Sequence, residues 1–316
     1  MLSGNLHGII AAMEPFSMLD DLSLKEIASL VPQRPEAAHK GTFGHLVVVA
    51  GSRGFTGAVK LVCNAAYRSG VGLVTAAVPE TIQGQIASSL VEPMTLGLPA
   101  TEADTVSCEA LETITTFSAE KSALVIGPGL STHFSTARLV RRLFSGRFLP
   151  MVVDADGLNA LAIYPERLES RASTPPQAEA IFTPHPGEMS RLTGIAAAAI
   201  QQERPEIAAY YAALWRVTVV LKGHGTIIAG PDGRVRHCPT GNHGMATGGT
   251  GDVLSGLIGG LLAQGISPFE AACTGVYIHG LAGDFAAREK TARALVASDI
   301  IEALPQAWRQ LERPGS

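Results

Sequence analysis

The stretch that decides the fold is Leu46-Val47-Val48-Val49-Ala50, an uninterrupted apolar run. A strand of a parallel sheet with helices on both faces is apolar at every position, whereas a half-exposed strand alternates. A glycine-rich turn follows at residues 51–57, and the pattern then predicts a helix over Ala58–Arg68 and a strand over Val71–Val78. This order of elements predicts an α/β fold with a parallel central sheet.

The same alternation continues along the rest of the chain. Further strands are predicted at Ala123–Ile126, Met151–Val153, Ala180–Thr183 and Val217–Lys222, and further helices at Ser135–Phe144, Glu206–Leu214, Asp252–Gln264, Pro268–Arg288 and Ala297–Leu311. Thr226–Ala229 and Val235–His237 flank Pro231-Asp232-Gly233, which predicts a hairpin and therefore antiparallel strands at one edge of the sheet. We expect one three-layer α/β/α domain over residues 39–316, after a lead-in of residues 1–38 with a short helix at Leu22–Val31.

Composition excludes several classes of function. A chain of 316 residues that is 46% apolar can bury a large core, and a net charge of −4 offers no basic surface for nucleic acid. The four cysteines lie far apart with no C-x-x-C pair, so we expect buried free thiols in a reducing cytoplasm. No basic region opens the chain, and the apolar stretch Val253–Ala263 is too short to span a bilayer, so we expect neither a signal peptide nor a membrane segment.

Glycine-rich and polar clusters fall where the predicted strands end. They occupy residues 51–57, 127–131, 154–159, 184–188, 222–226 and 241–252. Ligands of open parallel sheets bind beyond the carboxyl ends of the strands. The clusters therefore predict one ligand site, built from loops that are distant in sequence.

The sharpest cluster is the run from Thr240 to Asp252, which leads directly into a helix. Glycines let a backbone approach a ligand closely, and free amides at a helix start bind anions. We therefore predict an anion hole formed by Gly248, Gly249, Thr250 and Gly251. Asp252 has two interpretations, a helix cap or a general base that accepts a proton from an attacking hydroxyl, and the adjacent glycines favour the base.

Three other clusters each allow a structural and a functional interpretation. Lys222 begins Lys222-Gly223-His224-Gly225-Thr226; by its position alone, a strand-end lysine with its ammonium in water is favoured over a phosphate-binding one. In Thr183–Glu188, the structural interpretation is that His185 and Glu188 begin a helix. The functional interpretation is that His185 contacts substrate and Glu188 orients a magnesium-bound water. Asp154 and Asp156 either anchor substrate or magnesium, or cap a helix, and a cap is expected for one of them.

Two common nucleotide-binding motifs are absent from the sequence. No G-x-x-x-x-G-K-[ST] occurs, and neither Gly70-Val71-Gly72 nor Gly127-Pro128-Gly129 continues into a dinucleotide fingerprint. The histidines have no zinc-ligand spacing. The predicted site therefore belongs neither to a P-loop enzyme nor to a Rossmann dehydrogenase.

Several segments, taken together and in order, resemble the ADP/ATP-dependent NAD(P)H-hydrate dehydratases, a family with a ribokinase-like fold. They are His39–Gly44, Ala50–Ser52 with Thr56–Ala58, Gly127–Gly129, Thr183–Glu188, Leu221–Gly223 and Gly241–Asp252. The resemblance extends from about residue 22 to the C-terminus. Many family members carry an epimerase domain in front, so the length of this chain implies a stand-alone dehydratase.

The resemblance implies a repair reaction on hydrated NADH or NADPH, which carries a hydroxyl on C6 of the nicotinamide ring. ADP or ATP would phosphorylate that hydroxyl, with Mg²⁺ as cofactor, and loss of phosphate would restore the double bond. Phosphate is a far better leaving group than hydroxide, and catalysis would consist mainly of positioning and charge stabilisation. A homo-oligomer, with a tetramer as the expected form, is also implied.

The resemblance also assigns roles to residues. Asp252 would be the base, and the amides of Gly248–Gly251 would hold the transferring phosphoryl group. The nucleotide would be bound by Lys222, Gly223, His224, Gly225, Thr226, Asn242 and Gly251, the hydrated nicotinamide by Ala58, Gly129, His185 and Asp252, and Mg²⁺ by Glu188 through a water. Ser131 and His224 depart from the usual pattern, which leaves the preferred dinucleotide and nucleotide open.

Two alternatives belong to other functional classes. A kinase of the same fold acting on a sugar or vitamin-precursor alcohol would use the same anion hole and aspartate, but would release a stable phosphorylated product. A non-catalytic nucleotide-binding protein would not need a carboxylate at the anion site, so Asp252 argues against that class.

Overall fold

The structure is a computed structural model that describes residues 19–146, 148–165, 168 and 179–312. Within these residues one sheet of ten strands runs in the order β1-β10-β9-β8-β7-β6-β5-β2-β3-β4. The strands are β1 (Asp20–Asp21), β2 (His45–Val49), β3 (Leu73–Pro79), β4 (Met94–Leu98), β5 (Ala123–Ile126), β6 (Met151–Val153), β7 (Ala180–Phe182), β8 (Thr218–Leu221), β9 (Thr226–Ala229) and β10 (Val235–Cys238).

The sheet is mostly parallel, as predicted. All neighbours from β4 to β8 pair in parallel, and only β9 runs the other way, antiparallel to both β8 and β10. In the central register, Val48 of β2 lies opposite Ala76 of β3 and Val125 of β5. The hairpin predicted around Pro231-Asp232-Gly233 is therefore confirmed as β9–β10.

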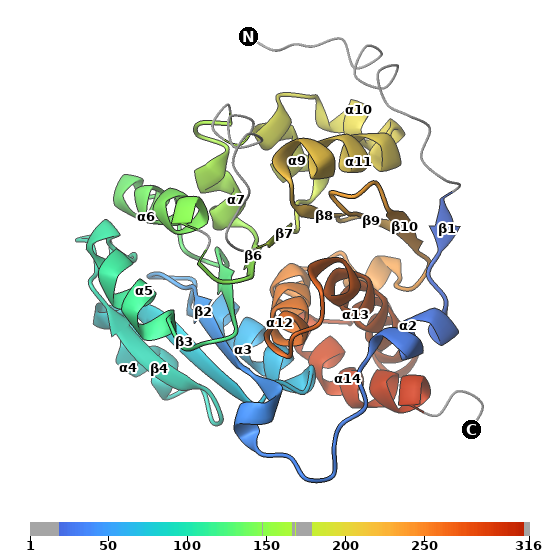
Figure 1. Cartoon of the computed structure of the whole chain (residues 1–316), viewed down its shortest axis with the longest axis horizontal. Coiled ribbons are helices and arrows are strands. Elements are labelled where there is room, and N and C mark those ends of the chain that lie inside the picture. Colours follow the sequence, from blue (N-terminus) through green and yellow to red (C-terminus); the bar gives the residue numbers. More distant parts are fainter. Residues whose placement is uncertain (1–18, 147, 166–167, 169–178, 313–316) are drawn as a thin grey trace.

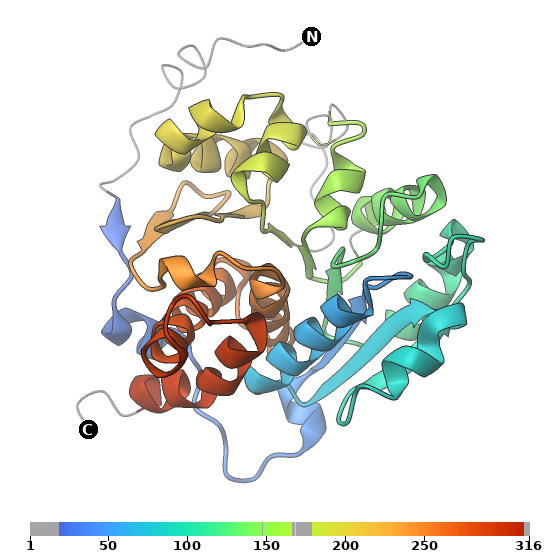
Figure 2. The ribbon, with the colours of Figure 1, turned by 180° about the vertical axis from the view of Figure 1, so that it is seen from behind.

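Helices cover both faces of the sheet and enclose two apolar layers. Leu46 and Val48 point into one layer, and Val47 and Val49 point into the other, which explains why the whole run is apolar. The first layer is covered by α2 (Leu24–Leu30), α3 (Thr56–Arg68), α4 (Gln83–Ala87), α12 (Thr250–Ala263), α13 (Pro268–Lys290) and α14 (Ala297–Glu312). The second is covered by α5 (Leu111–Ser118), α6 (Phe134–Gly146), α7 (Asp156–Leu161), α9 (Pro186–Thr193), α10 (Ala197–Gln202) and α11 (Arg204–Trp215). Figures 1 and 2 show α9–α11 on one side of the sheet and α12–α14 on the other.

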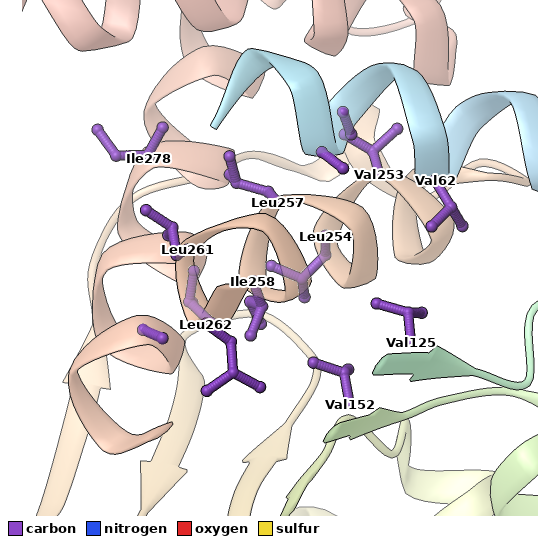
Figure 3. Packing of buried hydrophobic residues seen from close by; sticks show 14 of the residues in the cluster. Val62, Val125, Val152, Val253, Leu254, Leu257, Ile258, Leu261, Leu262 and Ile278 are labelled. Carbon is purple, nitrogen blue, oxygen red and sulfur yellow. The ribbon is translucent and has the colours of Figure 1, made fainter. Parts of the chain in front are cut away.

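Helix α12 lies at the centre of the first layer. Every residue from Val253 to Ala263 is buried, and Figure 3 shows Leu254 and Ile258 facing Val125 and Val152 of the sheet. Glycines let its neighbours approach closely: a Cβ at Gly256 would lie 2.1 Å from the carbonyl oxygen of Val62 in α3, and a Cβ at Gly259 would lie 2.3 Å from Val125. The axial and rotational position of α12 is therefore fixed by contact on several sides.

Part of the predicted lead-in joins this core. The helix predicted at Leu22–Val31 is α2, which Ser23 caps by accepting a hydrogen bond from the Glu26 amide (3.2 Å). Strand β1, which was not predicted, pairs in parallel with β10 and forms the outermost strand of the sheet. Residues 1–18 lie outside the described residues, and the boundary at residue 38 stays a prediction.

The segment His39–Gly44 lies at the amino end of β2, opposite the strand ends where the ligand site is predicted. It forms a short 3-10 helix, η1 (Lys40–Phe43), with His39 as its cap. Gly44 has φ +75, and a Cβ there would lie 1.9 Å from the carbonyl oxygen of Ala263 at the end of α12. This segment therefore locks the start of β2 to the end of α12 and takes no part in the predicted site.

The elements that the sequence did not predict have weak local patterns. Strand β4 lies at the sheet edge, is interrupted by Gly97, and leaves Met94 43% exposed, so it shows neither a continuous apolar run nor a clean alternation. Helices α4, α5 and α10 were also missed. Helix α12 begins at Thr250, two residues before the predicted start.

The cysteines are free, as expected. Cys63, Cys238 and Cys273 are buried and Cys108 is half-buried. Across the residues that the structure describes, no helix combines the length and the apolar character that a membrane crossing requires.

We expect Gly256→Ala to lower the free energy of unfolding by about 3 kcal/mol, because the new methyl group overlaps the Val62 carbonyl and α3 must shift. Gly84→Ala is the matched control, since Gly84 is an exposed residue of α4 with open space where the Cβ would lie. There we expect a gain of about 0.5–1 kcal/mol from the entropy of the unfolded chain. Urea denaturation measures both; equal effects of the two substitutions would show that α12 tolerates displacement.

Candidate active site

Two adjoining hollows lie at the carboxyl ends of the strands. A cleft of about 520 Å³ is lined by Asp154, Ala155, His185, Pro186, Lys222, Gly223 and Met245–Asp252. A cavity of about 420 Å³ is lined by Lys222–Thr226, Thr240–His243, Met245, Ala246, Thr250, Gly251, Leu254, Val276, His279 and Gly280. Six residues line both hollows: Lys222, Gly223, Met245, Ala246, Thr250 and Gly251. The predicted convergence of distant loops on one edge is thus realised.

The start of α12 forms the wall between the two hollows. Gly249 occupies the cap position with φ +90, and no side chain caps the helix. Within the described chain, the amides of residues 248–251 form no backbone hydrogen bond, and the Thr250 hydroxyl donates to the carbonyls of Met245 (3.0 Å) and Thr247 (3.1 Å). The first turn of α12 therefore presents unpaired amides and the positive end of the helix dipole to the cleft.

Asp252 is the third residue of α12, so its interpretation as the helix cap is wrong. It is half-buried and lines the cleft directly beside the unpaired amides. Burial and the neighbouring Asp154 raise the pKa of Asp252 to about 7, although Lys222 opposes the rise. Such a carboxyl exchanges protons near neutral pH, which suits a general acid or base.

Lys222 lies inside a buried charge cluster, so the interpretation of a strand-end lysine with its ammonium in water is wrong. Its Nζ is 2.9 Å from Asp154 Oδ1 and 3.6 Å from Glu188 Oε2, and its side chain is only 19% exposed. Burial alone would lower the pKa of this ammonium, but Asp154 and Glu188 raise it. The cleft therefore contains a fixed positive charge.

Asp154 is fully buried beneath that ammonium. Besides Lys222, it accepts a hydrogen bond from the Ser255 hydroxyl of α12 (2.6 Å). Burial opposes its ionisation, but Lys222, Ser255 and Thr183 together hold the pKa of Asp154 below its usual value. Neither Asp154 nor Asp156 caps α7, whose cap residue is Ala155 with no side-chain hydrogen bond, so the predicted cap is wrong.

Asp156 instead ties two loops together. It accepts hydrogen bonds from the Ser131 amide (2.8 Å) and from Asn159 Nδ2 (3.1 Å). The loop after β5 is thereby fixed against α7.

His185 and Glu188 form a capping box at the start of α9, so the structural interpretation of this pair is confirmed. His185 Nδ1 accepts hydrogen bonds from the amides of Gly187 (2.9 Å) and Glu188 (3.3 Å), and Glu188 Oε2 accepts one from the His185 amide (2.8 Å). His185 is exposed at the surface of the protein and lines the cleft. The partial burial of its ring and the nearby charge of Lys222 lower the pKa of His185. Glu188 is buried behind it, and burial raises the pKa of Glu188.

The residues predicted to bind the nucleotide come together around the cavity. Lys222, Gly223, His224, Gly225, Thr226, Asn242 and Gly251 all line it. Asn242 is held in place because its Nδ2 donates to the Gly283 carbonyl (2.9 Å) and to Asp284 (2.9 Å). The structure adds Leu254 and Val276 as apolar lining.

His279 also lines the cavity, and the sequence did not predict it as a site residue. Burial lowers the pKa of His279 to about 4, and its Nε2 has no hydrogen-bond partner. It lies in the middle of α13, where the surrounding apolar pattern identifies only a core helix. No local signal in the sequence could have placed it at a cavity.

The residues predicted to bind the hydrated nicotinamide are only partly brought together. His185 and Asp252 face the same cleft. Ala58 and Gly129 lie side by side at neighbouring strand ends, since a Cβ at Gly129 would be 3.2 Å from the Ala58 Cβ, but neither lines the cleft. Gly129 has φ +64, and Phe55, which is 56% exposed, also contacts it.

No group of three or more His, Cys, Asp or Glu side chains is arranged to hold a metal ion among the described residues. Asp154 and Glu188 both pair with Lys222, and Asp156 accepts a hydrogen bond from the Ser131 amide. Two carboxylate groups are less engaged: Asp252 acts on Lys222 only at longer range, and Glu188 Oε1 lies 3.5 Å from His185 Nε2. Any divalent cation here would depend on oxygen atoms from a bound ligand and water.

Comparisons with known proteins agree with this geometry. A family model described as NAD(P)H-hydrate dehydratase matches residues 46–306. The chain is 49% identical over 284 residues to the bifunctional NAD(P)H-hydrate repair enzyme Nnr of Moorella thermoacetica, which covers 90% of this chain and 53% of that relative. The chain thus spans about half the length of the bifunctional relatives that it matches.

Solved structures give the same result for the fold. The ADP/ATP-dependent NAD(P)H-hydrate dehydratase of Bacillus subtilis, co-crystallised with ATP/Mg²⁺, has a TM-score of 0.79 at 30% identity, over 93% of this chain and 99% of that one. A ribokinase-like superfamily protein of Enterococcus faecalis has a TM-score of 0.77 at 27% identity, over 95% of this chain and 100% of that one. The predicted three-layer ribokinase-like fold is confirmed.

We expect Asp252→Asn to stabilise the protein at pH 8 and to have little effect at pH 4. The pKa of this carboxyl is about 7 in the folded protein and 3.8 in the unfolded chain, so the folded state binds a proton that the unfolded state has released. The free energy of unfolding therefore falls as the pH rises from about 4 to 7. At about 1.4 kcal/mol per pKa unit the bound is about 4 kcal/mol, which solvent in the open cleft reduces to roughly 1–2 kcal/mol. Urea denaturation at both pH values measures the difference; a loss of stability at pH 8 would contradict the raised pKa.

Proposed function

The chain belongs to the NAD(P)H-hydrate dehydratase family, and we propose that it converts hydrated NADH or NADPH back to NADH or NADPH with ADP or ATP as the phosphate donor. The observation that carries the proposal is the uncapped first turn of α12. It separates a nucleotide-sized cavity from a cleft, and it bears a carboxyl with a pKa near neutrality. Phosphoryl transfer requires a donor on one side, an acceptor on the other, and amides between them.

The nucleotide would occupy the 420 Å³ cavity. Leu254 and Val276 offer an apolar surface to a base, and the glycine-rich backbone of residues 222–226 allows close approach. Its phosphates would point toward the wall shared with the cleft, where Gly251 and Lys222 lie. This direction would bring the terminal phosphate to the amides of Gly248–Gly251.

Asp252 would act as the base. It accepts the proton of the C6 hydroxyl as the hydroxyl oxygen bonds to the terminal phosphorus of the donor, and the bond from phosphorus to the departing AMP or ADP breaks. The lone pair of the ring nitrogen then expels the phosphate as the bond between C6 and the phosphate oxygen breaks, and transfer of a proton from C5 to water restores the C5–C6 double bond. The products are NAD(P)H, phosphate and AMP or ADP.

The protein would lower the barrier mainly through fixed charges. The unpaired amides of α12 and the ammonium of Lys222 would stabilise the negative charge that gathers on the transferring phosphoryl group. His185 would contact the hydrated nicotinamide from the opposite wall, and Ala58 and Gly129 would shape the space beyond it. Because Asp252 must be ionised to act as the base, the rate should fall below about pH 7.

Mg²⁺ fits this site as an ion held by the nucleotide. It would neutralise phosphate charge and prefers oxygen ligands with several waters. Glu188 would reach it through a water from Oε1, since its Oε2 is occupied by the His185 amide and Lys222. We further propose, from the family resemblance, a homo-oligomer with a tetramer as the expected form; the four free cysteines support a cytoplasmic location.

The direct test is return of NADH absorbance from hydrated NADH with ADP or ATP present. We expect activity in the wild type, with AMP or ADP and phosphate as co-products, and a loss of about a hundredfold or more in Asp252→Ala. Asp232→Ala on the β9–β10 hairpin, where Asp232 only pairs with Arg234, is the control and should be unchanged. Accumulation of a stable phosphorylated product without NADH would favour a kinase, and no turnover with either nucleotide would refute the proposal.

A further inference from the structure

The carboxylate of Asp154 has no role in the reaction proposed above, yet it is the most buried charge beside the cleft. Asp154 is 1% exposed, and both of its carboxylate oxygens accept hydrogen bonds. Oδ1 accepts one from Lys222 Nζ (2.9 Å), and Oδ2 accepts one from the Ser255 hydroxyl (2.6 Å). A charged side chain buried this deeply requires a partner, and replacing the pair with apolar residues often costs little stability. The requirement for a charge pair here therefore calls for a functional explanation.

The pair places the ammonium of Lys222 directly against the first turn of α12. A Cβ at Gly251 would lie 3.4 Å from Lys222 Nζ and 3.9 Å from Asp154 Oδ2. Ser255 belongs to the same helix one turn later, so its hydrogen bond ties the carboxylate to α12 itself. Asp154 therefore links the Lys222 ammonium, at the end of a strand, to Ser255 in α12. This link sets the position of the ammonium relative to the unpaired amides.

Three carboxylates compete for this single ammonium. Asp154 is nearest at 2.9 Å, Glu188 is at 3.6 Å, and Asp252 acts on it at longer range. Without the charge on Asp154, the ammonium would shift toward Glu188 or Asp252. A shift toward Asp252 would pair the lysine with the base and withdraw it from the phosphoryl group.

We propose that Asp154 is a positioning residue that holds the Lys222 ammonium at the anion hole, where it stabilises the transferring phosphoryl group. The inference rests on the proposed phosphoryl transfer. Both oxygens of Asp154 are engaged, one by Lys222 and one by Ser255, so Asp154 would act through Lys222 and not by direct contact with a ligand. It follows that its contribution to the rate must disappear when the lysine is absent.

A double-mutant cycle tests this dependence, with hydrated NADH and ADP as substrates and NADH absorbance as the readout. In the wild type, Asp154→Asn should lower kcat by about tenfold or more and change the KM for ADP by less than about threefold. In a Lys222→Met background, whose kcat should itself be about a hundredfold lower, Asp154→Asn should change kcat by less than about twofold. Equal effects of Asp154→Asn in both backgrounds, or full activity of Asp154→Asn, would overturn the proposal.

Two further variants keep the test decisive. Ser255→Ala retains both charges and removes only the 2.6 Å hydrogen bond between Ser255 and Asp154, so it provides a test even if Asp154→Asn does not fold. We expect kcat to fall several-fold at unchanged KM. An unchanged kcat would overturn the proposal. Glu26→Gln, which loses an ion pair with Arg236 on the far side of α13, is the matched control and should retain full activity. Inactivity of the wild type would refute the reaction itself, whereas an active wild type with an active Asp154→Asn refutes only the role of Asp154.

Discussion

The rest of the structure depends on the close packing of helix α12. Its first turn can leave amides unpaired only if something other than a cap fixes where the helix begins. That role is filled by contacts along its length: Gly256 meets the backbone of α3, Gly259 meets β5, and the end of the helix meets Gly44. Burial of every residue from Val253 to Ala263 supplies the stabilisation that the uncapped start lacks.

The same packing concentrates charge in a place where charge is unfavourable. Asp154, Glu188 and Asp252 surround one ammonium, so the cluster carries an excess of negative charge when all are ionised. The protein tolerates this by pairing Asp154 with Lys222 and by letting Asp252 hold its proton up to about pH 7. An anion arriving at α12 would meet amides and an ammonium, while Asp252 remains able to exchange its proton near neutral pH. The protein therefore loses some stability by placing three carboxylates around one ammonium, and the proposed phosphoryl transfer requires this arrangement.

The sequence was sufficient for the parallel sheet and for most of the lining of the 420 Å³ cavity. Runs such as Leu46–Ala50 are readable because both faces are covered, and the glycine clusters lie at strand ends by the logic of the fold. It was insufficient where partners are far apart in the chain. By its position alone, Lys222 was expected to hold its ammonium in water, because nothing local reveals Asp154, 68 positions away. Likewise His279 reads as an ordinary residue of a buried helix, and only the tertiary structure brings it to a cavity.

A crystal structure with ADP and Mg²⁺ would show whether the first turn of α12 binds the transferring phosphate. We expect the adenosine in the cavity beside Leu254 and Val276, with the terminal phosphate within hydrogen-bonding distance of the amides of Gly248–Gly251. Phosphates bound away from α12, or an adenosine seated outside this cavity, would contradict it.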